Sequence, residues 1–180
     1  DLLYNIPVDY MYPVYPNESY ELDGMKLRVF RSKHKMVFPK PRVGIGELEK
    51  KVGRLGSIDY MDYCLTTEEN MNMFISGGGI PEWTIQNIYG YFSEIRPNII
   101  FRQTSSKWSP EEFAHCIAKW HAPIVFPLHH DGLAKASGMT LDEYFERTNE
   151  ELRKIGCNAM VLNADRNDKW FEIKTSIEVK

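Results

Sequence analysis

Polar and apolar residues alternate on both sides of an Asp-Gly pair near the start of the chain. Asp23-Gly24 between two such segments is a strong hairpin signal, because this dipeptide suits the tight turn that joins antiparallel strands. A second alternating pair of segments is joined by the acidic turn Glu68-Glu69-Asn70. The predicted hairpin strands are 19–22 with 25–30, and 58–67 with 71–76.

The second half of the chain carries two helix-start signals. Ser109 with Glu112, and Thr140 with Glu143, each place a hydroxyl residue three positions before a Glu, which is the capping-box pattern. Gly156 is expected to end the second of these helices. The predicted helices are 83–92, 110–120 and 141–155, and the predicted strands are 98–101, 124–128, 160–162 and 170–173.

The order of these elements predicts an α/β fold with a mixed sheet, in which two hairpins are followed by a βαβα arrangement. Residues 1–18 are rich in Tyr and Pro and are expected to be a connecting segment. Residues 19–180 are expected to form one structural unit. A flavodoxin-like small-molecule binder would also fit the later βαβα pattern, but it requires parallel strands throughout, which the hairpins contradict.

Composition and charge exclude several kinds of partner. The 180 residues have a formal net charge of -3 with dispersed Lys and Arg, so no nucleic acid is expected. No apolar run reaches the length that crosses a bilayer, so no membrane is expected. Three distant cysteines without C-x-x-C spacing favour free thiols and a cytoplasmic location. The chain begins at Asp1, so we expect a processed protein or a piece of a longer one, and a removed targeting segment stays open.

The candidate chemistry follows the apolar run 122–128, where His129, His130 and Asp131 are adjacent. Open α/β sheets place their chemistry at such strand ends, and imidazole is both the commonest metal ligand and a general base near neutral pH. A surface loop that carries two histidines is the alternative, and the triplet alone does not decide between them. The run Gly77-Gly78-Gly79 lacks the Lys-Ser or Lys-Thr of a phosphate loop, so nucleotide binding is not predicted.

Three short motifs, taken in order, resemble one family. They are Val29-Phe30-Arg31-Ser32-Lys33-His34, Met73-Phe74-Ile75-Ser76-Gly77 and Phe126-Pro127-Leu128-His129-His130-Asp131. The segment 20–180 resembles the C-terminal half of a metallo-β-lactamase-fold hydrolase, an αββα sandwich that holds one or two metal ions between its sheets. The family's strands end in a ligand His, in Ser-Gly-Asp or Thr-Gly-Asp, and in Pro-x-His.

The resemblance implies a role for each candidate residue. His34 and His129 are the expected zinc ligands, and a structural His at a strand end is the alternative for each. His130 is expected to support the site or face the substrate, because adjacent residues on a strand point to opposite sides. Asp131 is expected to orient an imidazole, and a turn cap is its alternative role. His130 and Asp131 are thus the candidate catalytic residues.

The chain departs from the family in two ways. Gly78 stands where the family has an Asp that bridges two metals, and the family's H-x-H-x-D-H loop occurs nowhere in the sequence. Two histidines cannot close a zinc site, which needs at least three protein ligands. We therefore expect the missing N-terminal half or a second chain to complete the site and cover the sheet, with homo-oligomer formation if the chain is alone.

The expected function is that of a metal-dependent hydrolase. Metal-bound hydroxide would attack an ester, lactone, amide or phosphoester of a small molecule, with this chain supplying part of the site. A non-catalytic binding or assembly module that has lost the metal site is the alternative. The fold does not choose among these substrates.

Overall fold

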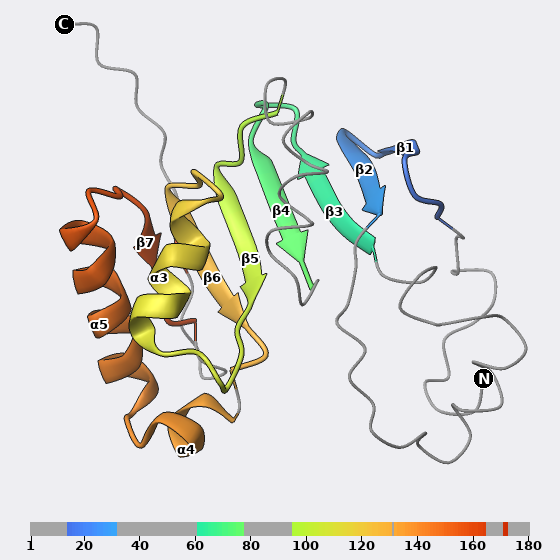
Figure 1. Cartoon of the computed structure of the whole chain (residues 1–180). Coiled ribbons are helices and arrows are strands. Elements are labelled where there is room, and N and C mark those ends of the chain that lie inside the picture. Colours follow the sequence, from blue (N-terminus) through green and yellow to red (C-terminus); the bar gives the residue numbers. More distant parts are fainter. Residues whose placement is uncertain (1–13, 32–60, 78–94, 131, 165–170, 173–180) are drawn as a thin grey trace, which may run out of the picture.

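The computed structural model describes residues 14–31, 61–77, 95–130, 132–164 and 171–172. The strands are β1 (Ser19–Leu22), β2 (Met25–Arg31), β3 (Met61–Thr66), β4 (Asn72–Ser76), β5 (Ile99–Gln103), β6 (Ile124–Leu128) and β7 (Met160–Val161). The helices are α3 (Pro110–Ala118), α4 (Leu133–Ser137) and α5 (Leu141–Lys154). These described strands form one mixed sheet in the order β1-β2-β3-β4-β5-β6-β7, and α3 and α5 pack on one of its faces (Figure 1).

The sheet changes from antiparallel to parallel halfway across. Strands β1 to β4 pair as antiparallel neighbours, and β4 to β7 pair as parallel neighbours. The predicted order of two hairpins followed by βαβα is therefore confirmed. Because β2, β4, β5 and β6 run in the same direction, their last residues lie at one edge of the sheet, which we call the carboxyl edge (Figure 1).

Both predicted capping boxes are present. At the start of α3 the Ser109 hydroxyl accepts from the Glu112 amide at 3.2 Å, and the Glu112 carboxylate accepts from the Ser109 amide at 2.8 Å. Thr140 and Glu143 repeat the same two contacts at 3.2 and 2.8 Å at the start of α5. These bonds satisfy amide groups that would otherwise lack partners in the first turn, so the local sequence fixes both helix starts.

Three details differ from the sequence expectations. Ile155 was expected to face inward, but it is 40% exposed because it caps the helix beyond the last turn of α5. The short helix α4 has no capping pattern and was not predicted. Of the strand predicted at 170–173 the structure describes only Phe171 and Glu172, which are not in a strand. The helix predicted at 83–92 lies outside the described residues.

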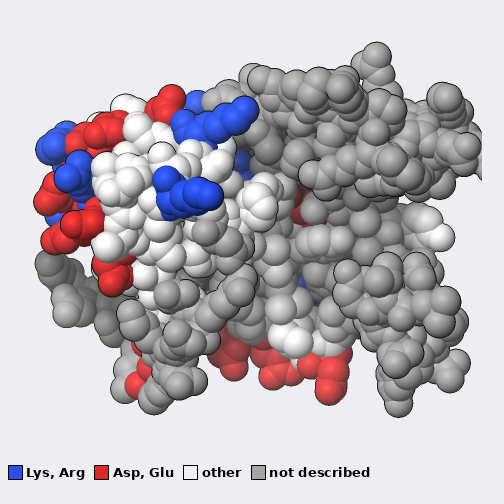
Figure 2. Space-filling model, turned by 90° about the horizontal axis from the view of Figure 1, so that it is seen from below, with Lys and Arg blue, Asp and Glu red and all other residues white. Residues whose placement is uncertain are grey.

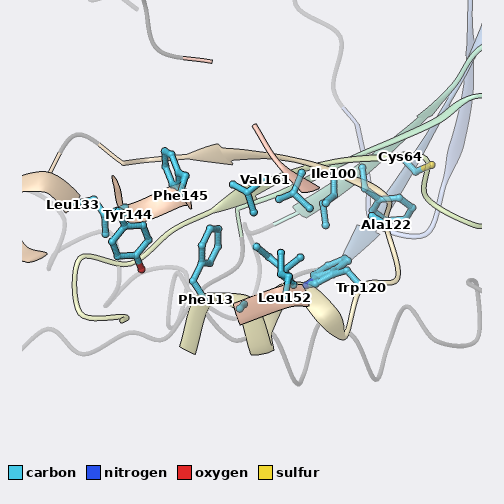
Figure 3. Packing of buried hydrophobic residues seen from close by; sticks show 14 of the residues in the cluster. Cys64, Ile100, Phe113, Trp120, Ala122, Leu133, Tyr144, Phe145, Leu152 and Val161 are labelled. Carbon is cyan, nitrogen blue, oxygen red and sulfur yellow. The ribbon is translucent and has the colours of Figure 1, made fainter. Parts of the chain in front are cut away.

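The core lies between the sheet and the two longer helices (Figure 3). The Phe74 ring stacks on Phe30 with 5.5 Å between centroids, and it lies 6.3 Å from the Trp120 ring just beyond α3. Phe113 of α3 faces Tyr144 of α5 at 6.5 Å. Each such buried side chain stabilises the fold by about 1.5–3 kcal/mol, so this half of the sheet and its helices are held together by one core.

The opposite face of the sheet is also apolar, and no described helix covers it. Register partners, which point to the same side, form two rows across the strands. The rows are Val29–Tyr63–Ile75–Phe101–Phe126 and Leu27–Leu65–Met73–Ile99–Ile124–Met160. We call them the apolar sheet face. Val29 is 1% exposed, whereas Ile75 and Met160 are 41% and 51% exposed, so this face is only partly covered.

Candidate functional site

The carboxyl edge gathers the strand ends that the sequence singled out. Arg31 ends β2, Ser76 ends β4, Gln103 ends β5 and Leu128 ends β6. Figure 2 views the molecule from this edge, where side chains of both charge signs mix over the α5 flank and uncharged side chains occupy the described surface beside it. The edge therefore presents no single sign of charge over its described part.

His129 follows directly after β6 and is exposed. Its backbone lies in the left-handed region at φ 57°, an uncommon conformation for a residue other than Gly. The Nδ1 atom of its ring lies 3.5 Å from the side-chain amide of Gln103 at the end of β5. The facing atom is the amide nitrogen Nε2 of Gln103, which donates, so Nδ1 of His129 accepts and the proton of the neutral ring lies on the ring's Nε2.

Thr104 holds the backbone of this strand end. Its hydroxyl lies 3.1 Å from the carbonyl oxygens of both Leu128 and His129, and its amide donates to the Leu128 carbonyl at 2.8 Å. Thr104 itself is only 3% exposed. The left-handed turn at His129 is thus fixed by hydrogen bonds from the neighbouring strand.

His130 points into the helical layer instead. Its Nδ1 lies 3.2 Å from the Pro127 carbonyl oxygen, so Nδ1 is the protonated nitrogen that donates. Its ring meets Phe145 of α5 edge-on at 6.1 Å, and its carbonyl accepts from the Leu133 amide at 2.9 Å. The two adjacent histidines therefore have different surroundings: His129 is exposed beside Gln103, and His130 packs against α5.

Three positions of the predicted site lie outside the described residues: His34, Gly78 and Asp131. The strand that leads to His34 ends at the same edge as β6, but three strands separate them. Four strand spacings of about 4.8 Å put these ends roughly 19 Å apart. Three extended residues span about 10 Å at most, so His34 reaches an ion at His129 only if its loop leads back over β3 and β4. Their meeting stays a prediction.

The described residues alone do not complete a zinc site. Among them no group of three or more His, Cys, Asp or Glu side chains is placed to hold a metal ion. His129 is one exposed imidazole donor, and a zinc ion needs at least three protein ligands. Any metal bound at His129 must take its other ligands from residues beyond the described part of this chain.

Sequence reasoning missed several polar residues at the edge. Besides Gln103 and Thr104, these are Asp62 and Arg102, whose side chains are buried there with exposed fractions of 0% and 1%, beside Ser76 of the second motif at 0%. A signal for two of them was present, because Asp62 and Arg102 are charged residues at inward positions of otherwise apolar strands. Charges in such positions are rare unless they are paired and hydrogen-bonded.

No family model and no curated protein matches the sequence. Among solved structures, the chain is similar to a metallo hydrolase of the hyperthermophilic archaeon Ignicoccus hospitalis, with a TM-score of 0.54 and 11% identity over 91% of this chain and 61% of that one. It also matches a protein of Parabacteroides distasonis designated a metal-dependent hydrolase, with a TM-score of 0.49 and 13% identity over 83% of this chain and 56% of that one.

The match to the archaeal protein confirms the expected fold: the chain has the mixed α/β architecture of a metallo hydrolase, in part. The expected resemblance to part of a metallo-hydrolase fold is thus confirmed at the level of the fold. The chain spans 56–61% of the length of these two structures. Separately, none of the described helices has the length and apolar character required to cross a membrane.

Proposed function

We propose that this chain is the C-terminal half of a metal-dependent hydrolase and that it supplies His129 as a metal ligand at the carboxyl edge. The observation that carries the proposal is the exposed His129 imidazole at the end of β6, on a left-handed backbone at φ 57° that Thr104 holds. A strained residue costs about 1–3 kcal/mol, and such residues cluster at functional sites. The exposed His121 has a similar φ of 52°, so the proposal depends on the position of His129 at the carboxyl edge as well as on its backbone.

The roles of the neighbouring residues follow from their contacts. Gln103 is proposed to orient the His129 ring through its amide nitrogen, 3.5 Å from Nδ1, and an ion bound at Nε2 would require this amide to turn so that its oxygen accepts from Nδ1. His130, anchored to Pro127 and Phe145, supports the strand end, and Asp131 stays our candidate for a second orienting group. When bound, zinc would polarise a carbonyl or phosphoryl oxygen and lower the pKa of a bound water.

The rest of the site is proposed to come from a second sheet. The chain spans 56–61% of the length of the two hydrolases, and the apolar sheet face has side chains such as Ile75 that are left 41% exposed. An apolar surface of this kind favours packing against another sheet, about 10 Å away, with its own apolar side chains. We propose that another segment of the same protein provides that sheet and the remaining ligands.

Elemental analysis of the intact gene product tests this function. We expect zinc near one equivalent or more per chain, and a loss of most of it in His129→Ala. The matched control is His121→Ala, which removes an exposed histidine from the turn before β6, at the other end of that strand. Absence of metal from the unmodified protein, or equal metal in both variants, would reject the proposal.

The second candidate function is a binding or assembly module without metal. The observation in its favour is that the described residues hold no group of three metal-ligating side chains. The same elemental analysis separates the two, because a module of this kind contains no metal with or without His129. Under the hydrolase proposal the substrate is a small molecule with an ester, lactone, amide or phosphoester bond.

A further inference from the structure

One peptide group at the carboxyl edge is held at both ends by charged side chains. The Gly77 amide donates to Asp62 Oδ1 at 3.2 Å, and the Ser76 carbonyl accepts from Arg102 Nη1 at 3.2 Å. This N–H and this C=O belong to the same peptide bond, the one that joins Ser76 to Gly77. The last residue of β4 is therefore fixed by its two neighbouring strands, β3 and β5.

The two charges are on the favourable poles of that peptide. A peptide group has a dipole of about 3.5 D with its positive end at the N–H, where Asp62 lies, and its negative end at the C=O, where Arg102 lies. Hydrogen bonds to ionised groups are about twice as strong as neutral ones. The side chains of Asp62 and Arg102 are 0% and 1% exposed, so water screens these contacts little.

Arg102 has further contacts that fix its guanidinium. Its Nη1 atom lies 3.4 Å from the Ser76 hydroxyl, and its Cζ atom lies 5.9 and 5.8 Å from the centres of the Trp108 and Trp120 rings. Such cation–π contacts are strongest where the cation is removed from water. Ser76 and Arg102 are also register partners in the parallel β4–β5 pair.

The core does not need buried charges at this place for its stability, because a fold with apolar side chains of similar volume in their place is often equally stable. The buried charges meet at one strand end, and that end lies at the same edge as His129. Phe74, two residues earlier on the same face of β4, is a plain core residue with 0% exposure. The change from apolar to polar side chains on this face of β4 thus occurs between Phe74 and Ser76, the last residue of the strand.

We infer that Asp62 and Arg102 are positioning residues that hold the Ser76–Gly77 peptide in one orientation at the edge where His129 lies. Calling this edge a metal site rests on the proposed function, but the orientation of the peptide does not. Neither residue is proposed to touch a substrate or a metal. Together with Thr104, which bonds to the end of β6, they would make the edge rigid, which a site with fixed ligand geometry requires.

Amide hydrogen exchange measured by NMR on the intact gene product tests the inference. Asp62→Ala should speed exchange at the Gly77 amide by about tenfold or more, relative to the amides of α5. Asp62→Asn retains a side-chain oxygen that can accept and should restore most of the protection. Ser76→Ala removes only the hydroxyl contact and should leave the Gly77 amide unchanged. A Gly77 amide that follows the α5 amides in Asp62→Ala would overturn the inference.

A control for general loss of stability is Thr148→Ala, since Thr148 is buried in α5 and bonds to the Tyr144 carbonyl at 2.9 Å. Thr148→Ala should speed hydrogen exchange at the Gly77 amide and at the α5 amides by the same factor. Zinc affinity, measured by competition with a chelating dye, gives the second readout: Asp62→Ala should weaken it by about 10-fold or more, as loss of outer contacts does. If exchange at the Gly77 amide changes in Asp62→Ala but zinc affinity does not, the proposed role of Asp62 in the metal site is rejected.

The two proposals fail in different ways. If the unmodified protein binds no zinc, the hydrolase proposal fails, and the Gly77 amide still decides whether Asp62 holds the peptide. If the protein binds zinc and Asp62→Ala changes neither readout, the hydrolase proposal stands and the positioning role is rejected.

Discussion

The Thr104 hydroxyl lies 3.1 Å from the His129 carbonyl oxygen and 3.1 Å from that of Leu128, so one buried side chain directly after β5 holds the end of β6. This contact joins residues 25 positions apart in the chain. It secures a left-handed residue whose imidazole is exposed, and it makes the orientation of that imidazole depend on the neighbouring strand.

Thr104→Val removes this hydroxyl and keeps the shape of the side chain. We expect a loss of about 1–2 kcal/mol in the free energy of unfolding, because the His129 carbonyl loses its hydrogen bond from the buried Thr104 hydroxyl. Zinc affinity of the intact protein should fall by about tenfold through the looser His129 backbone. Urea unfolding and metal competition measure the two effects. Thr148→Val, which removes an equally buried hydroxyl from α5, should lower stability and leave zinc affinity unchanged.

His129→Gly should separate backbone strain from metal binding. Glycine adopts positive φ without the steric cost, so we expect unfolding stability to stay equal or rise by up to about 1 kcal/mol, while zinc is lost. His121 is a matched position, exposed and at φ 52°, at the opposite end of β6. His121→Gly should have the same effect on stability and keep the zinc. A zinc loss in both variants would contradict the assignment of His129.

Ile75→Lys tests whether the apolar sheet face is covered in the intact protein. A buried lysine would lower unfolding stability by at least about 1 kcal/mol, whereas surface changes usually stay within about 0.5 kcal/mol. Ile155→Lys is the control, because the two side chains are 41% and 40% exposed in this chain and Ile155 lies beyond α5 instead of on the sheet. Equal small effects would show that nothing packs on this face. Stability that rises with protein concentration would identify a second copy as the cover.

Glu143 should make stability depend on pH in the acid range. The backbone hydrogen bond from Thr140, and then its side-chain hydrogen bond, lower the pKa of Glu143 below its ordinary 4.5. A lowered pKa in the folded state gives stability that is present above pH 4.5 and is lost as the pH falls through the lower folded value. The midpoint temperature of thermal unfolding should therefore fall less steeply between pH 6 and pH 3 in Glu143→Gln than in the unmodified protein. Glu146→Gln, on the same helix but outside the capping box, should keep the original slope.

Local sequence signals predicted the parts of the fold that depend on near neighbours. The Asp23-Gly24 turn, the two capping boxes and the boundaries of β6 are all found as expected, because each depends on residues within a few positions. Helix α4 was missed because Gly132 at its start gives no side-chain cap. Ile155 was misassigned because the periodic pattern continues one residue beyond the helix that carries it.

For the candidate site, the sequence identified His129 by its place after an apolar strand, but gave no sign of its neighbours. Gln103 and Thr104 lie 25 or 26 positions away and meet it only because β5 and β6 are parallel neighbours. Asp62 and Arg102 did carry a sequence signal, as charged residues at inward positions of apolar strands, but that signal did not indicate their shared partner. Each looks like an isolated charge in an apolar strand until strand pairing brings both to the same peptide.

The amino-acid order thus determined the strands, the capped helices, the mixed sheet and the strand end that bears His129, since turns, caps and alternation act over a few residues. Only the tertiary structure decided which polar groups meet at the carboxyl edge and which apolar rows stay partly exposed. These depend on strand order and register, which are set by burial of side chains far apart in the chain.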